Sequence, residues 1–191
     1  MPNPITLLGI AGSLRRGSYN RAALVAAQGL VSPGVTLELF DLADIPPFNQ
    51  DTERSPVASV VALKQRIRAA DTVLIATPEY NFSIPGVLKN AIDCASRPYG
   101  DSAWAGKPVA VMGASVSLLG SARAQYHLRQ VFVALDMHPL NRPEVMIGSA
   151  AKAFDAEGRL TDEASLALIR QLLVDLVAWT RRLGTAPALA D

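Results

Sequence analysis

The chain has 191 residues, of which 50% are hydrophobic, and its 18 basic and 17 acidic residues give a net charge of +1. This length corresponds to about one domain, and the near-neutral charge argues against nucleic acid or a membrane surface as a partner, because both attract clustered basic residues. The one cysteine, Cys94, excludes an internal disulfide framework and a cysteine-based metal site, and it favours a cytoplasmic protein. With only two histidines, an all-histidine zinc site is also excluded.

The first apolar segment, Ile5 to Ile10, is expected to be a buried strand rather than a secretion signal. Basic residues follow it at Arg15 and Arg16 instead of preceding it, which is the wrong side for a signal peptide. The sequence contains no run of the ~18 uncharged apolar residues that a membrane span needs. We expect one domain over residues 1–184, followed by a short tail at residues 185–191.

Short apolar runs alternate with helical patterns along the chain. Strands are predicted at residues 5–10, 35–40, 72–76, 109–112 and 143–147. Helices are predicted at residues 18–30, 55–70, 84–95, 124–135 and 162–184, and residues 41–54 are predicted to be a loop. Ser55 and Pro56 favour a helix start, since serine caps helices and proline fits their first position. This alternation predicts a doubly wound parallel sheet.

Ligands of such sheets bind beyond the carboxyl ends of the strands, so the loops after the first, third and fourth strands are candidates. After the first strand, residues 12–20 (GSLRRGSYN) lead directly into a helix. Glycines, serines, an asparagine and arginines at a helix N-terminus are the ingredients of a phosphate-binding loop. The alternative is an ordinary turn with a serine cap.

This loop differs from other known phosphate loops. It lacks the Gly-Lys-Ser/Thr ending of a Walker A motif, and its glycines do not have G-x-G-x-x-G spacing. A phosphotyrosine phosphatase would need a cysteine here, whereas Cys94 lies in the predicted third helix. A receiver domain would need acidic residues after the first strand. The loop therefore suits a phosphate that is held rather than transferred.

The loop after the third strand, residues 78–86 (PEYNFSIPG), combines two aromatic side chains with an asparagine and a serine. Such a mixed surface suits a flat heteroaromatic ring, which stacks on aromatic faces and forms hydrogen bonds at its edge. The alternative is that Tyr80 and Phe82 pack on the core or on another subunit.

With these two loops, the sequence resembles the NAD(P)H-dependent FMN reductase family, within it the small quinone and chromate reductases. GSLRRGSYN is similar to the FMN phosphate loop of that family, and PEYNFSIPGVLKNAID is similar to its isoalloxazine segment. The stretches GSARAQYHLRQ and NRPEVMIG also follow the family, so the resemblance covers essentially the whole domain. It implies a flavodoxin-like, three-layer α/β fold with a five-stranded parallel sheet in the order 2-1-3-4-5.

The resemblance also implies which residues bind FMN. The phosphate is expected to be held by Ser13, Arg15, Ser18 and Asn20, with backbone or packing contributions from Leu14 and Tyr19. The flavin ring is expected to lie along Pro78, Glu79, Tyr80, Asn81 and Phe82, and to touch Ser115. Two positions depart from the family: Cys94 stands where tryptophan is frequent, which bears on subunit packing, and Ser117 stands where glycine is common, which bears on the backbone near the flavin.

The activity that the resemblance implies is a ping-pong reaction. Hydride passes from NADPH or NADH to FMN, and two electrons then pass to a quinone or a similar acceptor, including free flavin, chromate and azo compounds. Because FMN carries the chemistry, we expect no catalytic side chain and no metal, and we expect Glu79 to be structural. Backbone N–H groups near Ser83 or Ser115 are candidates to stabilise the reduced flavin.

Two other functions remain open. A flavodoxin-type electron carrier is disfavoured because carriers of that type are strongly acidic and this chain is nearly neutral. A flavin-free module that binds phosphate or a nucleotide is the other alternative.

The resemblance further implies a homodimer or homotetramer with the flavin near the subunit interface. Arg123, Tyr126 and Glu144 lie in segments that resemble subunit contacts of the family. The alternative is that they form weak surface pairs within one chain. His127 and His138 are expected at the surface or behind the site.

Overall fold

The computed structural model describes residues 3–184; the predicted tail at residues 185–191 lies outside the described residues. The strands are β1 (Ile5–Ala11), β2 (Val35–Phe40), β3 (Thr72–Ala76), β4 (Pro108–Ala114), β5 (His138–Pro139) and β6 (Val145–Ile147). They form one parallel sheet in the order β2-β1-β3-β4-β5, and β6 also pairs with β4. The predicted α/β fold and strand order are confirmed.

The fifth position of the sheet is shared by two short strands. His138 of β5 pairs with Pro108 at the start of β4, whereas Val145 of β6 pairs with Met112 near its end. The connecting residues include Pro143, which has no N–H to donate to a strand ladder. The strand predicted at residues 143–147 is therefore present only as β6, and the sequence pattern missed β5.

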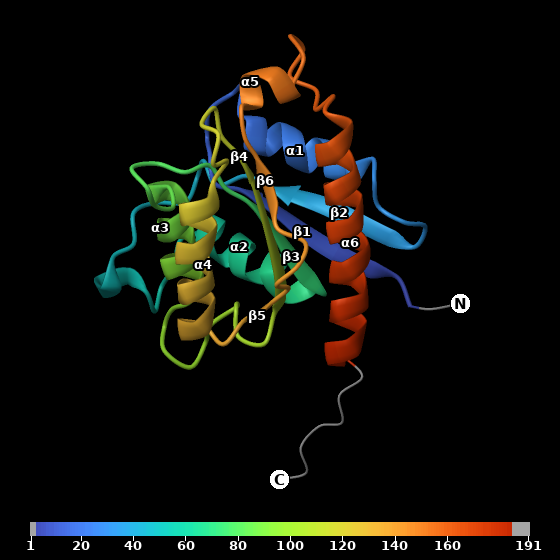
Figure 1. The fold of residues 1–191 in the computed structure, drawn as a ribbon. Helices are drawn as coiled ribbons and strands as arrows, with labels where there is room; N and C mark the ends of the chain where they lie inside the picture. The colour runs from blue at the N-terminus through green and yellow to red at the C-terminus, as the bar shows by residue number, and fades with distance from the viewer. Residues whose placement is uncertain (1–2, 185–191) are drawn as a thin grey trace.

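The long helices cover both faces of the sheet (Figure 1). On one face lie α1 (Tyr19–Gln28), the short α5 (Ala150–Ala153) and α6 (Glu163–Gly184). On the other face lie α2 (Ala58–Ala69), α3 (Gly86–Ala95) and α4 (Ala122–Ala134). The loop between β2 and α2 contains a 3₁₀ turn, η1 (Gln50–Thr52), which, like α5, was not predicted. Helices on both faces are the expected consequence of right-handed crossovers between parallel strands.

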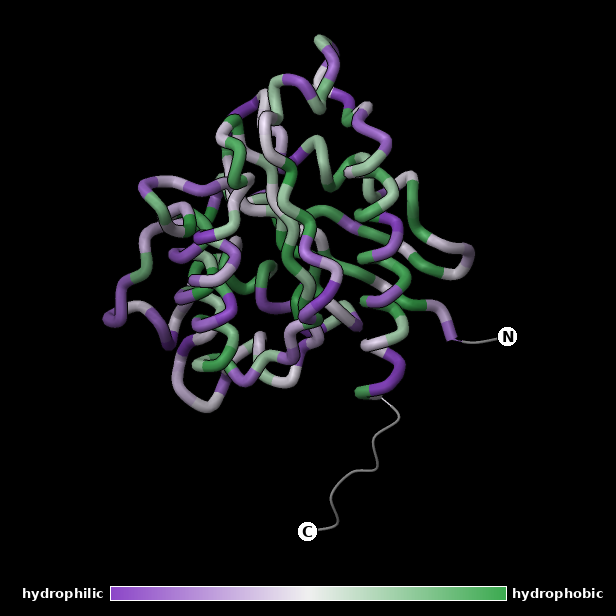
Figure 2. Tube along the Cα trace, viewed as in Figure 1, coloured by the Kyte–Doolittle hydropathy of each residue, from purple (hydrophilic) through white to green (hydrophobic). Residues whose placement is uncertain are grey.

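The core consists of two apolar layers, one on each side of the sheet. Alternate residues of β3 point to opposite layers: Val73 and Ile75 pack toward α2 and α3, whereas Leu74 packs toward α1 and α6. All five residues of β3 are buried, which explains why its sequence is a continuous apolar run. In Figure 2 the strands are mostly hydrophobic, and polar residues gather on the outer sides of the helices.

Helix α2 begins later than predicted. Its N-cap is Val57 rather than Ser55. The N–H of Ser55 donates to the carbonyl of Thr52 at 3.0 Å, so this residue still belongs to the turn that follows η1. The proline after Ser55 also disfavours helical backbone at the preceding residue. Pro56 therefore precedes the helix instead of occupying its first position.

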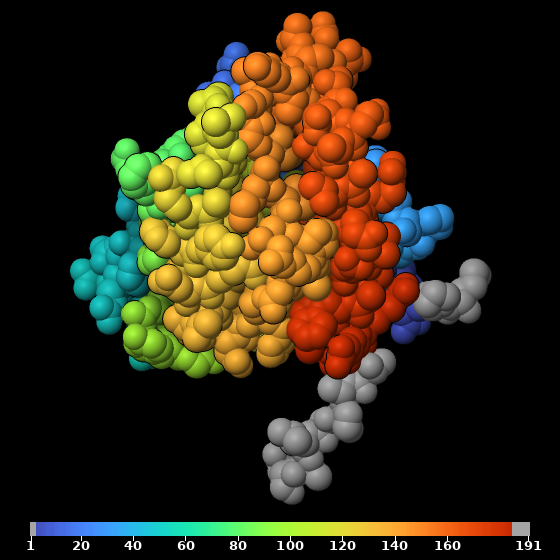
Figure 3. Space-filling model, viewed as in Figure 1, coloured from blue at the N-terminus to red at the C-terminus, as the bar shows by residue number. Residues whose placement is uncertain are grey.

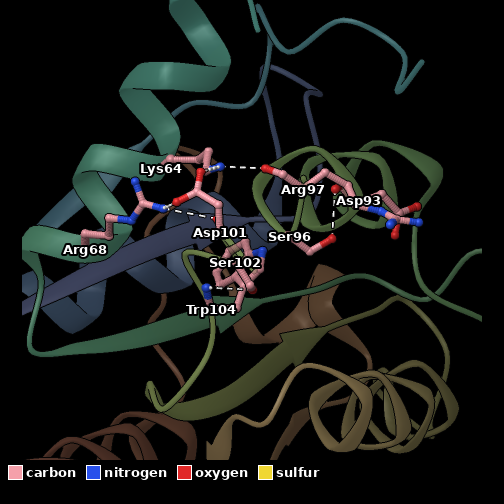
Figure 4. Close-up of polar contacts among 8 residues, drawn as sticks. All are labelled: Lys64, Arg68, Asp93, Ser96, Arg97, Asp101, Ser102 and Trp104. Atoms are coloured by element: carbon pink, nitrogen blue, oxygen red, sulfur yellow. Dashed lines mark hydrogen bonds and ion pairs between the residues drawn. The ribbon is translucent and has the colours of Figure 1, made fainter. Parts of the chain in front are cut away.

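A polar network joins α2 to the segment that follows α3 (Figure 4). The Lys64 side chain is only 6% exposed, and its Nζ donates to Arg97 O and Asp101 Oδ2 at 2.5 Å each. Arg68 pairs with the same carboxylate. The hydrogen bond from Lys64 is the main reason that the pKa of Asp101 lies below its ordinary value. A buried ammonium needs such partners, so this network fixes one side of the fold.

The face of the molecule seen in Figure 3 is formed by α4, by the segment that contains β5 and β6, and by α6. Among residues 3–184, no helix combines the length and apolar character required to cross a bilayer. The same residues bring together no cluster of three histidine, cysteine or acidic side chains that could hold a metal ion.

Candidate functional site

Three loops meet at the carboxyl edge of the sheet, as predicted. They are the phosphate loop (residues 12–18) after β1, the ring loop (residues 78–85) after β3, and the β4 loop (residues 115–121). Ser13 Oγ of the phosphate loop lies 3.4 Å from the Tyr80 hydroxyl of the ring loop. Since β1, β3 and β4 are neighbours in the sheet, the order of the strands brings the loops together.

The phosphate loop ends in a capped helix start. Ser18 is the N-cap of α1, and its Oγ accepts the N–H of Arg21 at 3.3 Å. The Arg15 side chain is exposed, with Cζ 5.3 Å from the centroid of the Tyr19 ring, which itself lies against Phe154. The Tyr19 ring thus lies near both Arg15 and Phe154, whereas its expected contribution at the FMN phosphate stays a prediction.

The phosphate loop has hydrogen-bond donors that suit an anion. The backbone N–H groups of Leu14, Arg16 and Gly17 have no acceptor within residues 3–184. The N–H of Tyr19 points along the first turn of α1, where no intrahelical acceptor exists. A phosphate group accepts such hydrogen bonds and is favoured by the helix dipole. The residues present therefore fit the phosphate of FMN.

Asn20 has a second role that the sequence did not reveal. The residue is 3% exposed. Its Nδ2 donates to Ala114 O at 2.9 Å, and its Oδ1 accepts the N–H of Ala114 at 2.8 Å. The amide thus bridges α1 to the end of β4, two segments that are 94 residues apart in the chain. A phosphate contact of Asn20 stays a prediction.

The ring loop contains a tight turn with unusual backbone. Tyr80 and Ser83 exchange two hydrogen bonds of 3.0 and 2.9 Å, and the two residues between them, Asn81 and Phe82, have φ values of 48° and 66°. Tyr80 is half exposed and Phe82 is 65% exposed. The aromatic side chains therefore do not pack into the core of this chain. The Arg123 guanidinium lies over the Phe82 ring, and the surface that Tyr80 and Phe82 leave exposed is available to a flat ring.

Glu79 faces α4 rather than the open edge of the sheet. Its side chain is 5% exposed; Oε2 accepts the N–H of Arg123 at 2.9 Å and that of Ala124 at 3.4 Å, and Oε1 accepts Arg123 Nε–H at 2.5 Å. A carboxylate at a helix N-terminus is stabilised by the helix dipole. The structure thus gives Glu79 the structural role that was expected of it, whereas its contact with the flavin ring stays a prediction.

The β4 loop combines polar and exposed apolar residues. The N–H of Ser115 donates to Ile147 O, and that of Ser83 donates to Tyr80 O, so these two N–H groups are already bound within the chain. Stabilisation of a reduced flavin by other N–H groups near Ser83 or Ser115 stays a prediction. Ser117 is exposed and donates its N–H to Ser115 Oγ. The exposed apolar residues Val116, Leu118 and Leu119 were missed, although an apolar run outside any predicted strand or helix was a visible signal.

The polar residues expected at a subunit contact are paired within the chain. Arg123 is bound to Glu79, whereas the Tyr126 hydroxyl donates to Glu144 Oε1 at 2.9 Å. This hydrogen bond to a carboxylate raises the pKa of Tyr126. His127 is exposed, and its Nδ1 lies 2.9 Å from Ser83 Oγ. This hydrogen bond attaches His127 to the ring loop.

Cys94 belongs to α3 and is buried against the loop that precedes η1. Its Sγ lies 3.7 Å from Pro46 O, and burial raises the pKa of the thiol. This departure from the family pattern therefore falls in the core of the chain.

A separate cavity of about 590 Å³ lies on the outer side of α1. Its lining combines Arg16 to Tyr19 with apolar residues of α1 and with residues 157–160. None of the residues of the ring loop or the β4 loop lines it, so of the three loops it adjoins only the phosphate loop.

Comparisons with known proteins identify the family of this chain. The sequence model of the family described as NADPH-dependent FMN reductase matches residues 5–152. An NAD(P)H-dependent FMN reductase of Pseudomonas aeruginosa is 56% identical over 184 residues, which are 96% of this chain and 99% of that protein. An NADPH:quinone oxidoreductase of Arabidopsis thaliana is 42% identical over 188 residues, 94% of this chain and 93% of that protein.

A solved structure has the same architecture. The flavoenzyme NAD(P)H:(acceptor) oxidoreductase FerB of Paracoccus denitrificans superposes with a TM-score of 0.85 at 37% identity, covering 93% of this chain and 98% of that one. The family match spans the phosphate loop, the ring loop and the β4 loop. By sequence and by fold, this chain belongs to the NADPH-dependent FMN reductase family.

Proposed function

We propose that this protein is an FMN-dependent oxidoreductase that takes electrons from NADPH or NADH and passes them to quinones or similar acceptors. The observation that carries the proposal is the meeting of a donor-rich phosphate loop and an exposed aromatic ring loop, joined at Ser13 and Tyr80, at one edge of the sheet. Relatives named as FMN reductases and quinone oxidoreductases support it.

The side chains would bind and orient the cofactor. FMN, when bound, supplies the hydride-accepting chemistry. Arg15 and the N-terminus of α1 would hold the phosphate, and Tyr80 and Phe82 would contact the ring. The exposed apolar residues of the β4 loop, Leu118 above all at 88% exposure, would keep water from one side of the ring and offer an apolar surface to the acceptor.

The direct test is cofactor identification followed by steady-state assays. We expect the purified protein to contain FMN and to oxidise NADPH or NADH in the presence of quinones, with free flavin, chromate and azo dyes as further acceptors. A protein that binds FMN but shows negligible NAD(P)H oxidation would be an electron carrier. A protein that binds no FMN, even after reconstitution, would be a flavin-free module.

The phosphate loop is tested by Arg15→Ala. Loss of a charge-assisted contact should weaken FMN binding by about 1.5–3 kcal/mol, roughly 10- to 150-fold, and should leave the affinity for riboflavin, which lacks the phosphate, unchanged. Arg16→Ala is the matched control for loss of one positive charge in the same loop. Fluorescence titration of the FMN-free proteins, wild type and both variants, with FMN and with riboflavin measures all six affinities. An unchanged FMN affinity in Arg15→Ala would locate the phosphate elsewhere.

We also propose that the enzyme is a cytoplasmic homodimer or homotetramer in which Arg123, Tyr126 and Glu144 lie at or near a contact between copies. The exposed aromatic and apolar residues of α4, Tyr126 and Val133, support such a contact. Light scattering would give the assembly, and Val133→Glu should dissociate a copy-to-copy contact made by α4. Cell fractionation would test the location.

A further inference from the structure

We propose that Arg123 is a positioning residue that holds the ring loop in its flavin-binding shape, an inference that rests on the proposed function. Its guanidinium lies between two parts of the ring loop. On one side Nε and a terminal nitrogen bind the buried carboxylate of Glu79. On the other side Cζ lies 3.7 Å from the centroid of the Phe82 ring.

The Phe82 backbone needs an external support. A positive φ is rare for a bulky side chain and costs free energy, and here two consecutive residues, Asn81 and Phe82, adopt it. Because Phe82 is 65% exposed, burial in the core cannot supply the compensation. Among the side-chain contacts of Phe82 within residues 3–184, the one with the Arg123 guanidinium, which lies over the ring, can supply it.

Arg123 is itself fixed by α4. Its own backbone N–H and that of Ala124 both donate to Glu79, so the carboxylate ties the first turn of the helix and the guanidinium together. Ser83, on the other side of the turn, is bound to His127 one turn further along α4. The first two turns of α4 and residues 79–83 therefore form one unit, with Arg123 at its centre.

Loss of the guanidinium should have a local consequence. The turn at Asn81 and Phe82 would leave its positive-φ conformation, the hydrogen bonds between Tyr80 and Ser83 would open, and the aromatic surfaces would lose their common orientation. The phosphate loop should keep its own shape, because Arg123 makes no hydrogen bond to residues 12–18 and the loop would lose only the 3.4 Å contact between Ser13 Oγ and the Tyr80 hydroxyl. Ring binding and phosphate binding should thus respond separately.

Arg123→Gln and Arg123→Lys test this role in the full chain. We expect Arg123→Gln to weaken FMN and riboflavin by the same factor, about 5-fold, to shift the absorbance maximum of bound flavin, and to speed hydrogen exchange at the Tyr80 and Ser83 amides of the FMN-free protein. Arg123→Lys keeps the charge but not the planar face, and should recover only part of the effect. Arg129→Gln, on the same helix but bound to Leu140 and Asn141, is the matched control.

A second variant isolates the strained turn. Phe82→Gly places glycine after Asn81, the pair most favoured in turns with two positive φ values, so the turn no longer needs support. In that background, Arg123→Gln should not change the exchange of the Tyr80 and Ser83 amides further. The inference would be overturned if the Tyr80 and Ser83 amides exchanged at the same rate in wild type and Arg123→Gln, and if both proteins bound FMN and riboflavin with the same affinities. A wild-type chain that binds neither flavin would refute the proposed function instead, and the exchange experiment on the turn would still decide the role of Arg123.

Discussion

Glu79 and Asn20 are single side chains that hold the backbone in place at the carboxyl edge of the sheet, where a ligand is expected. Each is nearly buried, and each links a loop or helix start to the backbone of a distant segment: Glu79 to the start of α4, and Asn20 to the end of β4. Both side chains accept a hydrogen bond from a backbone N–H, and the Asn20 amide also donates one to a backbone carbonyl. Such contacts fix the loops before any ligand arrives.

Asn20→Ala should destabilise the FMN-free protein. The substitution leaves the N–H and the carbonyl of Ala114 buried without partners, which should lower the free energy of unfolding by about 2 kcal/mol. Urea unfolding measures the change, and Asn141→Ala, at an exposed position, is the control with an expected effect within about 0.5 kcal/mol. If Asn20→Ala weakened FMN binding without changing stability, ligand binding rather than bridging would be its main role.

At the scale of elements, the end of β4 and the start of α4 approach so closely that only glycine fits between them. A Cβ on Gly113 would lie 1.8 Å from Ser121 Oγ and 2.3 Å from the carbonyl oxygen of Thr77. This approach brings the N-terminus of α4 next to the ring loop, within reach of Glu79. The glycine thus sets the distance between two elements of the candidate site.

Gly113→Ala should therefore lower stability by about 1–3 kcal/mol or more, as overpacking does. Adding Ser121→Ala should not restore it, because the clash with the Thr77 backbone remains. Gly86→Ala is the control: this glycine is the first residue of α3, and within the described residues no heavy atom lies within 4 Å of the position that its methyl group would take. Alanine there should stabilise by up to about 1 kcal/mol. Thermal unfolding compares the three variants, and a Gly113→Ala protein as stable as wild type would contradict the argument.

At the scale of the whole molecule, the network around Asp101 couples stability to pH. The pKa of Asp101 is lowered in the folded protein, chiefly by the Lys64 hydrogen bond. A carboxyl with a lowered pKa stabilises the fold fully above its unfolded pKa, and that contribution is lost as the pH falls through the folded pKa. Its side chain is half exposed, so solvent screening keeps the contribution modest.

Asp101→Asn should lower Tm at pH 7 by about 2–4 °C, the equivalent of roughly 1 kcal/mol for a domain of this size. The difference from wild type should stay constant down to about pH 5 and shrink below the ordinary carboxyl pKa of 3.8. Asp44→Asn, whose carboxylate makes no ion pair within residues 3–184, serves as the control. If the Tm difference between wild type and Asp101→Asn grew as the pH fell, the predicted effect of Asp101 on stability would have the wrong sign.

The sequence predicted what depends on local pattern. Strands β2 and β3 have their predicted bounds, and the phosphate loop and ring loop lie at the predicted edge. The predicted start of α2 at Ser55 was wrong, because a Ser-Pro pair is equally compatible with a helix cap and with a turn. The Glu79–Arg123 pair, 44 residues apart, and the bridge from Asn20 depend on how strands and helices pack, which no local pattern encodes.

The bridge between Asn20 and Ala114 also bears on the order in which the protein is made. Both partners of the Asn20 amide belong to a residue synthesised 94 positions later. A nascent chain that ends before β4 can form the first strand and helix, but the start of that helix still lacks its anchor. We therefore expect the FMN phosphate to be captured only after β4 has left the ribosome, so cofactor loading is a late event in the biosynthesis of this enzyme.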